Sequence, residues 1–159
     1  MTPVIGTDEF LADLLRETDP ASLLIITQAD KLGRRAAAIG DGHWIAQPPV
    51  GEDALPPPGL DLAVVDAAGD WPPGTLPGLV SRLRDVLARR VVILARADNG
   101  GDLNRGAIVG LGFHRLGVSE DDSGRRRWYE FDMAHYKVTP DWLNPRHWAN
   151  PELWDKYRW

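Results

Sequence analysis

The chain has 159 residues, of which 43% are apolar or aromatic and 26% are charged, the balance of an ordinary globular domain. It contains no cysteine, which excludes disulfide scaffolds, thiolate zinc sites, iron–sulfur clusters and cysteine nucleophiles. A net charge of −5, with one short basic run at residues 125–127, argues against a nucleic-acid partner. No stretch is apolar enough to cross a bilayer and residues 1–18 lack a signal-peptide pattern, so we expect one cytoplasmic domain over residues 1–159, without a membrane partner.

Helix and strand patterns alternate in the first part of the chain. Thr7 precedes two acidic residues and an apolar stripe, which predicts a helix capped by Thr7 that ends before the proline of residues 19–20. Residues 22–27 are a nearly continuous apolar run, typical of a strand covered on both faces of a parallel sheet. A short helix is predicted over residues 30–39, and a second strand over residues 43–47.

A strand, a helix and another strand follow in the middle of the chain. Residues 48–59 hold five of the thirteen prolines and form a loop. Residues 60–66 predict a buried strand, residues 77–88 carry apolar residues at helical spacing, and residues 91–95 are again fully apolar. This βαβ unit repeats the order of the preceding segment, so the fold class is α/β with a mainly parallel sheet.

The remainder predicts a hairpin and a distinct tail. A short helix is expected over residues 103–111, and residues 113–119 and 126–133 flank an acidic turn, as in a β-hairpin. The core thus ends at residue 133, and we expect residues 134–159 to be a strap packed on it.

Tryptophan is concentrated in that tail. Four of the seven tryptophans lie in the last 18 positions. Because each ring carries a large apolar surface, we expect Trp142 and Trp148 to be buried against the sheet or its flanking helices, while Asn144 and Asn150 hold turns. The alternative is an exposed recognition patch.

Residues 21–118 resemble an abbreviated class I methyltransferase scaffold, the Rossmann-like fold that binds S-adenosylmethionine. The pieces that carry the resemblance are the strand 60–66, the end of the next helix at 82–87, the strand 91–95 and the entry to the hairpin at 111–116. The resemblance implies a three-layer, Rossmann-like, methyltransferase-type sheet with a C-terminal hairpin.

The tail resembles the C-terminus of a family of uncharacterised bacterial proteins of similar length. Its distinctive motifs are Tyr136-Lys137 and residues 140–144, 148–152 and 156–159. The resemblance implies a small protein of unknown function and supplies no catalytic residues.

The cofactor loop departs from the methyltransferase pattern. Such enzymes need a glycine-rich turn after the first strand and an acidic residue after the second. Residues 27–33 contain only Gly33, which falls inside the predicted helix, and the second strand is followed by no carboxylate until Glu52.

A candidate pocket can still be drawn at the carboxyl ends of the strands, where open α/β sheets place ligands. Asp66 ends a parallel strand there, either as a site residue or as a cap for a loop amide. Residues 70–73 that follow, Asp-Trp-Pro-Pro, contain the residue types of an amino-methyltransferase loop in a different order, or simply close a loop. The candidate pocket residues are Thr27, Gln28, Asp30, Asp66 and Trp71, and we expect side chains to reduce or fill the space.

Other chemistry finds no support in the residue pattern. The four histidines, His43, His114, His135 and His147, lack metal-site spacing, so no metal site is expected. No serine elbow or phosphate-binding loop is present. Residues 121–122 are expected at a solvated hairpin tip, and the basic run at 125–127 along a strand edge that deters pairing.

These observations favour a protein of unknown function that is a non-catalytic derivative of the methyltransferase scaffold, binding a small ligand or a protein partner and no cofactor. The alternative is an active S-adenosylmethionine-dependent methyltransferase with an atypical cofactor loop. A homo-oligomer joined through the tail is a third hypothesis.

Overall fold

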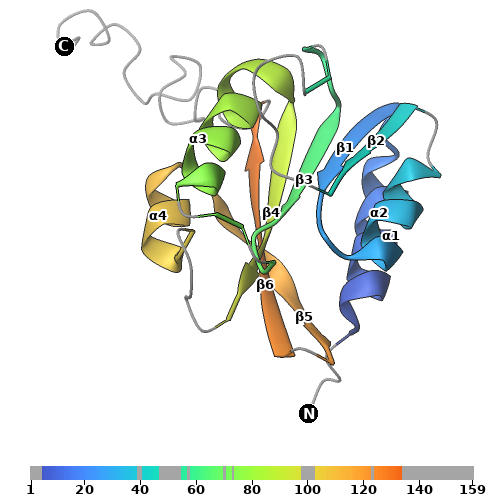
Figure 1. The fold of residues 1–159 in the computed structure, drawn as a ribbon, viewed down its shortest axis with the longest axis vertical. Coiled ribbons are helices and arrows are strands. Elements are labelled where there is room, and N and C mark those ends of the chain that lie inside the picture. Colours follow the sequence, from blue (N-terminus) through green and yellow to red (C-terminus); the bar gives the residue numbers. More distant parts are fainter. Residues whose placement is uncertain are drawn as a thin grey trace, which may run out of the picture.

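A computed structural model describes residues 5–38, 41–46, 55–56, 58–69, 71–72, 74–97, 103–122 and 124–133. Within these ranges helices and strands alternate and end in a hairpin (Figure 1). In chain order the elements are α1 (Thr7–Thr18), β1 (Ser22–Ile26), α2 (Asp30–Ala37), β2 (Asp41–Ile45), β3 (Leu62–Asp66), α3 (Thr75–Arg82), the π-helical turn η2 (Leu83–Leu87), β4 (Arg90–Arg96), α4 (Arg105–Gly110), β5 (His114–Asp121) and β6 (Gly124–Asp132).

The strands of the described ranges form one six-stranded sheet in the order β2-β1-β3-β4-β6-β5. The strands β1 to β4 are parallel, and β6 runs antiparallel between β4 and β5. From β1 the chain moves to β2 on one side and then crosses to β3 on the other. The direction of winding therefore reverses between β1 and β3.

Helices cover both faces of this sheet (Figure 1). One face packs against α1 and α2, and its buried cluster includes Leu11, Leu32 and Trp128. The other face packs against α3, η2 and α4, with Leu79 and Ile108 in its cluster. Because β1, β3 and β4 contribute side chains to both clusters, their apolar runs are buried on both faces. The predicted three-layer α/β class with a mainly parallel sheet is confirmed.

Several element boundaries and local roles differ from the sequence predictions. Thr7 is the first residue of α1, not its cap, and its hydroxyl bonds Ser119 Oγ at 2.9 Å and Asp121 Oδ2 at 2.9 Å. The second strand begins at residue 41, two residues before its predicted start at residue 43, because pairing with β1 overrides local preference. The helix predicted to end at residue 88 changes to a π-helical turn over its last five residues.

The basic run at residues 125–127 does not form an edge. It lies on β6, which is paired on both sides by β4 and β5. Its predicted role in deterring edge-to-edge pairing was therefore wrong, because the hairpin folds back into the sheet instead of extending it.

The predictions for the tail, including those for Trp142, Trp148, Asn144 and Asn150, lie outside the described residues. Among the helices that are described, none combines the length and the hydropathy of a membrane-spanning segment.

An aromatic pair joins α1 to the hairpin. The ring of Phe10 stacks on that of Trp128 with centroids 4.4 Å apart, and Trp128 Nε1 donates to Ser119 Oγ at 2.8 Å. The ladder between β5 and β6 shifts register between Arg115 and Gly117. A Cβ at Gly117 would lie 2.7 Å from the Phe10 ring, so this position has room for glycine only. The bulge and the missing side chain thus make the seat for the aromatic pair.

We predict that Gly117→Ala lowers the free energy of unfolding by about 1–3 kcal/mol, because the added methyl group overpacks the Phe10 ring. In a Phe10→Leu background the smaller side chain can move aside, so the same change costs less. Urea unfolding of the four combinations measures the coupling, with Gly78→Ala on open α3 surface as the matched control. An equal cost of Gly117→Ala in both backgrounds would contradict the packing argument.

Candidate functional site

The candidate site lies at the carboxyl ends of β1 and β3, where the winding of the sheet reverses. Thr27 follows the last residue of β1, and Asp66 is the last residue of β3. Thr27 Oγ1 donates a hydrogen bond to Asp66 Oδ2 at 2.6 Å. The two side chains are only 0% and 7% exposed, so this bond is shielded from water. The structure thus joins two of the predicted pocket residues directly.

The same two side chains also hold the loops that follow their strands. Thr27 Oγ1 accepts from the backbone N–H of Ala29 at 3.0 Å, and Asp66 Oδ1 accepts from that of Ala68 at 3.1 Å. Each contact spans two residues, the geometry of a side chain that closes its own turn. Asp66 therefore does cap a loop amide, the structural role considered for it in the sequence.

Trp71 and Gln28 approach this junction from the two loops. Trp71 Nε1 donates to the backbone oxygen of Asp66 at 2.7 Å, which fixes the half-buried indole beside β3. Gln28 Oε1 lies 2.8 Å from the place that a Cβ on Gly69 would take, and Trp71 Nε1 lies 3.3 Å from it. The loop after β1 and the loop after β3 therefore meet at Gly69.

Asp30 stands apart from the other predicted pocket residues. Its side chain is exposed in the first turn of α2. A negative charge at that place complements the helix dipole, which explains the residue without a ligand.

Trp44 belongs to this region and was missed by the sequence reasoning. It lies on β2, and its Nε1 donates to the backbone oxygen of Thr27 at 3.0 Å. Its ring occupies the space that a side chain at Gly33 of α2 would need. Gly33 is thus a glycine for helix–strand packing. The available signal was a tryptophan within the predicted second strand, residues 43–47.

Burial dominates the electrostatics of Asp66. It raises the pKa of this carboxyl above its ordinary range, and the hydrogen bonds from Thr27 and the Ala68 N–H oppose the effect only in part. Among more distant charges, Arg126 favours the ionised form and Asp121 opposes it. The folded chain therefore holds the Asp66 proton more tightly than the unfolded chain does.

Metal-ligating residues do not gather around the site. In the described ranges no three of the His, Asp and Glu side chains converge as a metal site requires. His43 and His114 are both exposed, while His135 and His147 lie outside those ranges.

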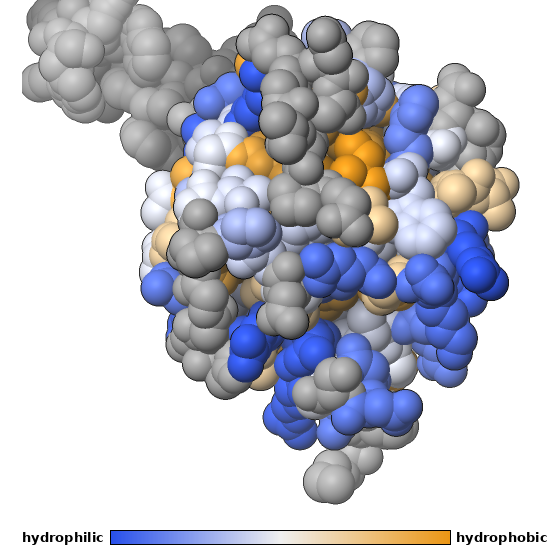
Figure 2. Space-filling model, in the orientation of Figure 1, coloured by the Kyte–Doolittle hydropathy of each residue, from blue (hydrophilic) through white to orange (hydrophobic). Residues whose placement is uncertain are grey.

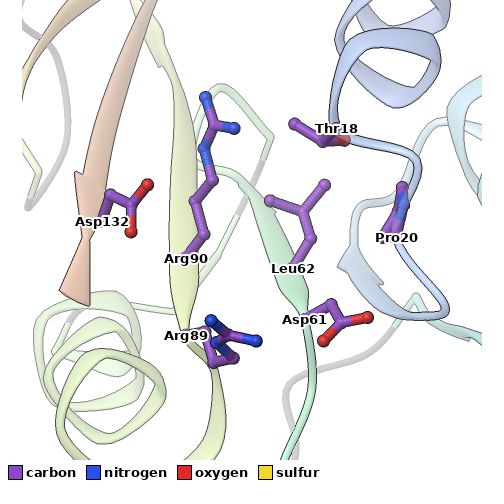
Figure 3. Close-up of a pocket in the computed structure, with 7 residues that line it drawn as sticks. All are labelled: Thr18, Pro20, Asp61, Leu62, Arg89, Arg90 and Asp132. Atoms are coloured by element: carbon purple, nitrogen blue, oxygen red, sulfur yellow. The ribbon is translucent and has the colours of Figure 1, made fainter. Parts of the chain in front are cut away.

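A surface pocket of about 300 Å³ lies at the opposite, amino end of the parallel strands (Figure 3). Arg89 and Arg90 line it at the start of β4, together with Asp61 and Asp132. These charges largely serve the fold, because Arg90 pairs with the buried Glu130, and Asp61 Oδ2 accepts from the Ala21 N–H at 2.9 Å. With two cations and two carboxylates, the pocket favours no one sign of ligand charge.

We predict that Asp66→Asn changes the pH dependence of stability in a defined direction. Below the ordinary pKa of aspartate, Asp66 is protonated in both the folded and the unfolded chain, so its ionisation does not change the free energy of unfolding. As pH rises, the Asp66 carboxyl ionises first in the unfolded chain, because its pKa is raised in the folded chain. The parent therefore loses stability until the pH passes the pKa of Asp66 in the folded chain. The Asp66→Asn variant has no titrating group at this position. Its stability relative to the parent should rise between the pKa of Asp66 in the unfolded chain and that in the folded chain, and then level off.

Urea unfolding at a series of pH values measures this difference. Asp85→Asn is the matched control, because the neighbouring Arg84 lowers the pKa of that exposed carboxyl and the difference should run in the opposite direction. A pH-independent difference between Asp66→Asn and the parent would show that the Asp66 pKa is ordinary.

Comparison with known proteins places the chain in a family. A solved structure similar to it is that of magnesium protoporphyrin IX methyltransferase from Synechocystis PCC 6803 with bound SAM, at 14% identity and a TM-score of 0.48, covering 77% of this chain and 76% of that one. No curated protein matches the sequence. The model of a family of unknown function, DUF6231, matches residues 6–159. The prediction of an uncharacterised family is thereby confirmed, and the chain belongs to the DUF6231 family of unknown function.

Proposed function

We propose that this protein is a non-catalytic derivative of the class I methyltransferase scaffold that acts by binding a protein partner or a small ligand. The observation that carries the proposal is the buried Thr27–Asp66 hydrogen bond across the switch point of the sheet. In a nucleotide-binding α/β domain the polar groups at this place face the ligand. Here they bond each other and the amides of their own loops.

The backbone after β1 supports the same proposal. Close approach of a nucleotide requires glycines in this turn, so that backbone N–H groups reach the ligand without a Cβ in the way. The turn carries side chains at every position from Thr27 to Leu32, and its first glycine packs under Trp44. Gln28, from the loop after β1, and Trp71, from the loop after β3, also meet at Gly69. A cofactor would have to displace several of these contacts.

An active S-adenosylmethionine-dependent methyltransferase is the second candidate. It is favoured by the acidic, aromatic and proline residues that follow β3 within residues 66–73, the residue types of an amino-methyltransferase loop. In this interpretation Asp66 would contact the cofactor or substrate after the Thr27–Asp66 bond breaks. The cost of leaving the Thr27 hydroxyl and the carboxylate without those partners, about 1–3 kcal/mol for each buried group, would reduce the affinity.

Calorimetric titration with S-adenosylmethionine and with S-adenosylhomocysteine separates the two candidates. We expect no binding in the micromolar range for either compound, because the polar groups at the ends of β1 and β3 already bond each other and their own loops. The Trp71→Ala variant is the matched comparison, since it removes one covering side chain and keeps the Thr27–Asp66 bond.

Micromolar binding to the parent, about −8 kcal/mol, would contradict the non-catalytic proposal. Binding that appears only in Trp71→Ala would support it, because the scaffold would then accept the cofactor only when a covering ring is removed.

A further inference from the structure

A groove of about 290 Å³ lies on the face of the sheet covered by α3 and α4, remote from the Thr27–Asp66 junction. Three elements form it: the π-helical turn η2, the end of α4 and the end of β6. Its lining residues are Arg84, Asp85, Gly110, Leu111, Gly112, Phe131 and Met133. Figure 1 shows that β6 ends at this side of the molecule, where the chain leaves the sheet.

The groove has an apolar floor and one fixed cation. Phe131 is buried, while Leu111 and Met133 are only partly buried. Arg84 Nη1 donates to the backbone oxygen of Leu111 at 2.6 Å, and its guanidinium lies 5.9 Å from the centre of the Phe131 ring. The Asp85 carboxylate binds the other side of the guanidinium at 2.8 Å and stays 57% exposed. Arg84 is therefore held in place before anything enters the groove.

The rim is shaped for a flat apolar group. Gly110 contributes no side chain and has open space where a Cβ would lie. The neighbouring Val109 is 54% exposed, one of the largest apolar exposures in the described ranges. A planar guanidinium, an aromatic floor and an exposed carboxylate together match an indole, which can stack on the cation and donate its N–H to the carboxylate.

We propose that Trp142 of this same chain occupies the groove. Met133 is a lining residue and also the last described residue before the 26-residue tail, so the tail leaves from the groove itself. Trp142 is nine residues further on, within about 30 Å of extended chain. Such a short tether gives an effective concentration in the millimolar range, so the groove is mostly occupied if the intrinsic dissociation constant of the indole lies below that range. This interaction is independent of whether the Thr27–Asp66 site binds a ligand.

Because the chain has no cysteine, a nitroxide spin label can be placed at one chosen position. We would attach it at Val109→Cys beside the groove, or at Arg34→Cys on α2, which lies on the opposite face of the sheet. The indole N–H signals of the full-length protein are then recorded by NMR, with Trp142 assigned through Trp142→Phe. We expect the Val109→Cys label to broaden the Trp142 signal strongly, and reduction of the label to reverse this effect. The Arg34→Cys label should cause no broadening of Trp142.

A blocking variant tests the seat itself. Gly110→Glu places a charged side chain in the groove, whereas Gly78→Glu adds the same side chain on open α3 surface. Broadening of Trp142 by the Val109→Cys label should be lost with Gly110→Glu and kept with Gly78→Glu. Loss of the broadening in both the Gly110→Glu and the Gly78→Glu variants, or in neither of them, would contradict docking in this groove.

The remaining outcomes also decide the proposal. If the Val109→Cys label does not broaden the Trp142 signal, the ring lies elsewhere, as expected for a tail that binds a separate partner. This result would overturn the proposal. Isotope-labelled chains without nitroxide can also be mixed with isotope-free chains that carry the Val109→Cys label. Broadening of Trp142 in that mixture would assign the groove to the tail of a second copy, and would overturn docking within one chain.

Discussion

A buried hydrogen bond between two side chains links the ends of β1 and β3, at the point where the direction of winding reverses. Thr27 and Asp66 end neighbouring parallel strands, and each also holds the loop that follows its strand. A carboxylate in this environment is stable only if its oxygens are satisfied, because burial without partners costs far more than the bond contributes. The two loops therefore depend on each other. The polar groups at these two strand ends bond each other and the amides of their own loops.

The layers of the fold could be predicted from the sequence because continuous apolar runs indicate which strands are buried. Strands covered on both faces need continuous apolar residues, and residues 23–26, 62–65 and 91–95 supply them. The helix after β3 was predicted from its spacing, but its final π-helical turn was not. A π turn keeps the same residues on the buried face and differs only in the backbone partner, here the bond from Ala88 N–H to Leu83 O. The spacing of the apolar residues therefore does not distinguish a π-helical turn from an α-helical one.

Contacts between distant residues account for what the sequence did not predict. Thr7 has the sequence context of a helix cap, but its hydroxyl lies beside Ser119 and Asp121 once α1 packs on the hairpin. Trp44 was overlooked because its partner atom, the Thr27 backbone oxygen, can be found only through the pairing of β1 and β2. The structure does bring the predicted residues Thr27 and Asp66 together, since a parallel sheet places the ends of neighbouring strands side by side. The approach of Gln28 and Trp71 to Gly69 depends on side-chain rotamers, which no sequence pattern specifies.

The hairpin contributes a constraint of its own, which fixes where the tail begins. Trp128 and Glu130 lie on the face covered by α1, and Glu130 is buried beside Arg90, with His114 Nε2 at 3.4 Å. A one-residue slip of β6 would turn both side chains to the other face and leave a buried carboxylate without its cation, at a cost of several kcal/mol. The register is thereby set up to the last pair, and the Met133 N–H then donates to the Arg89 backbone oxygen at 2.9 Å. The same charge pairing that holds β6 in the sheet thus places Met133, the last described residue, at the groove formed by η2, α4 and β6.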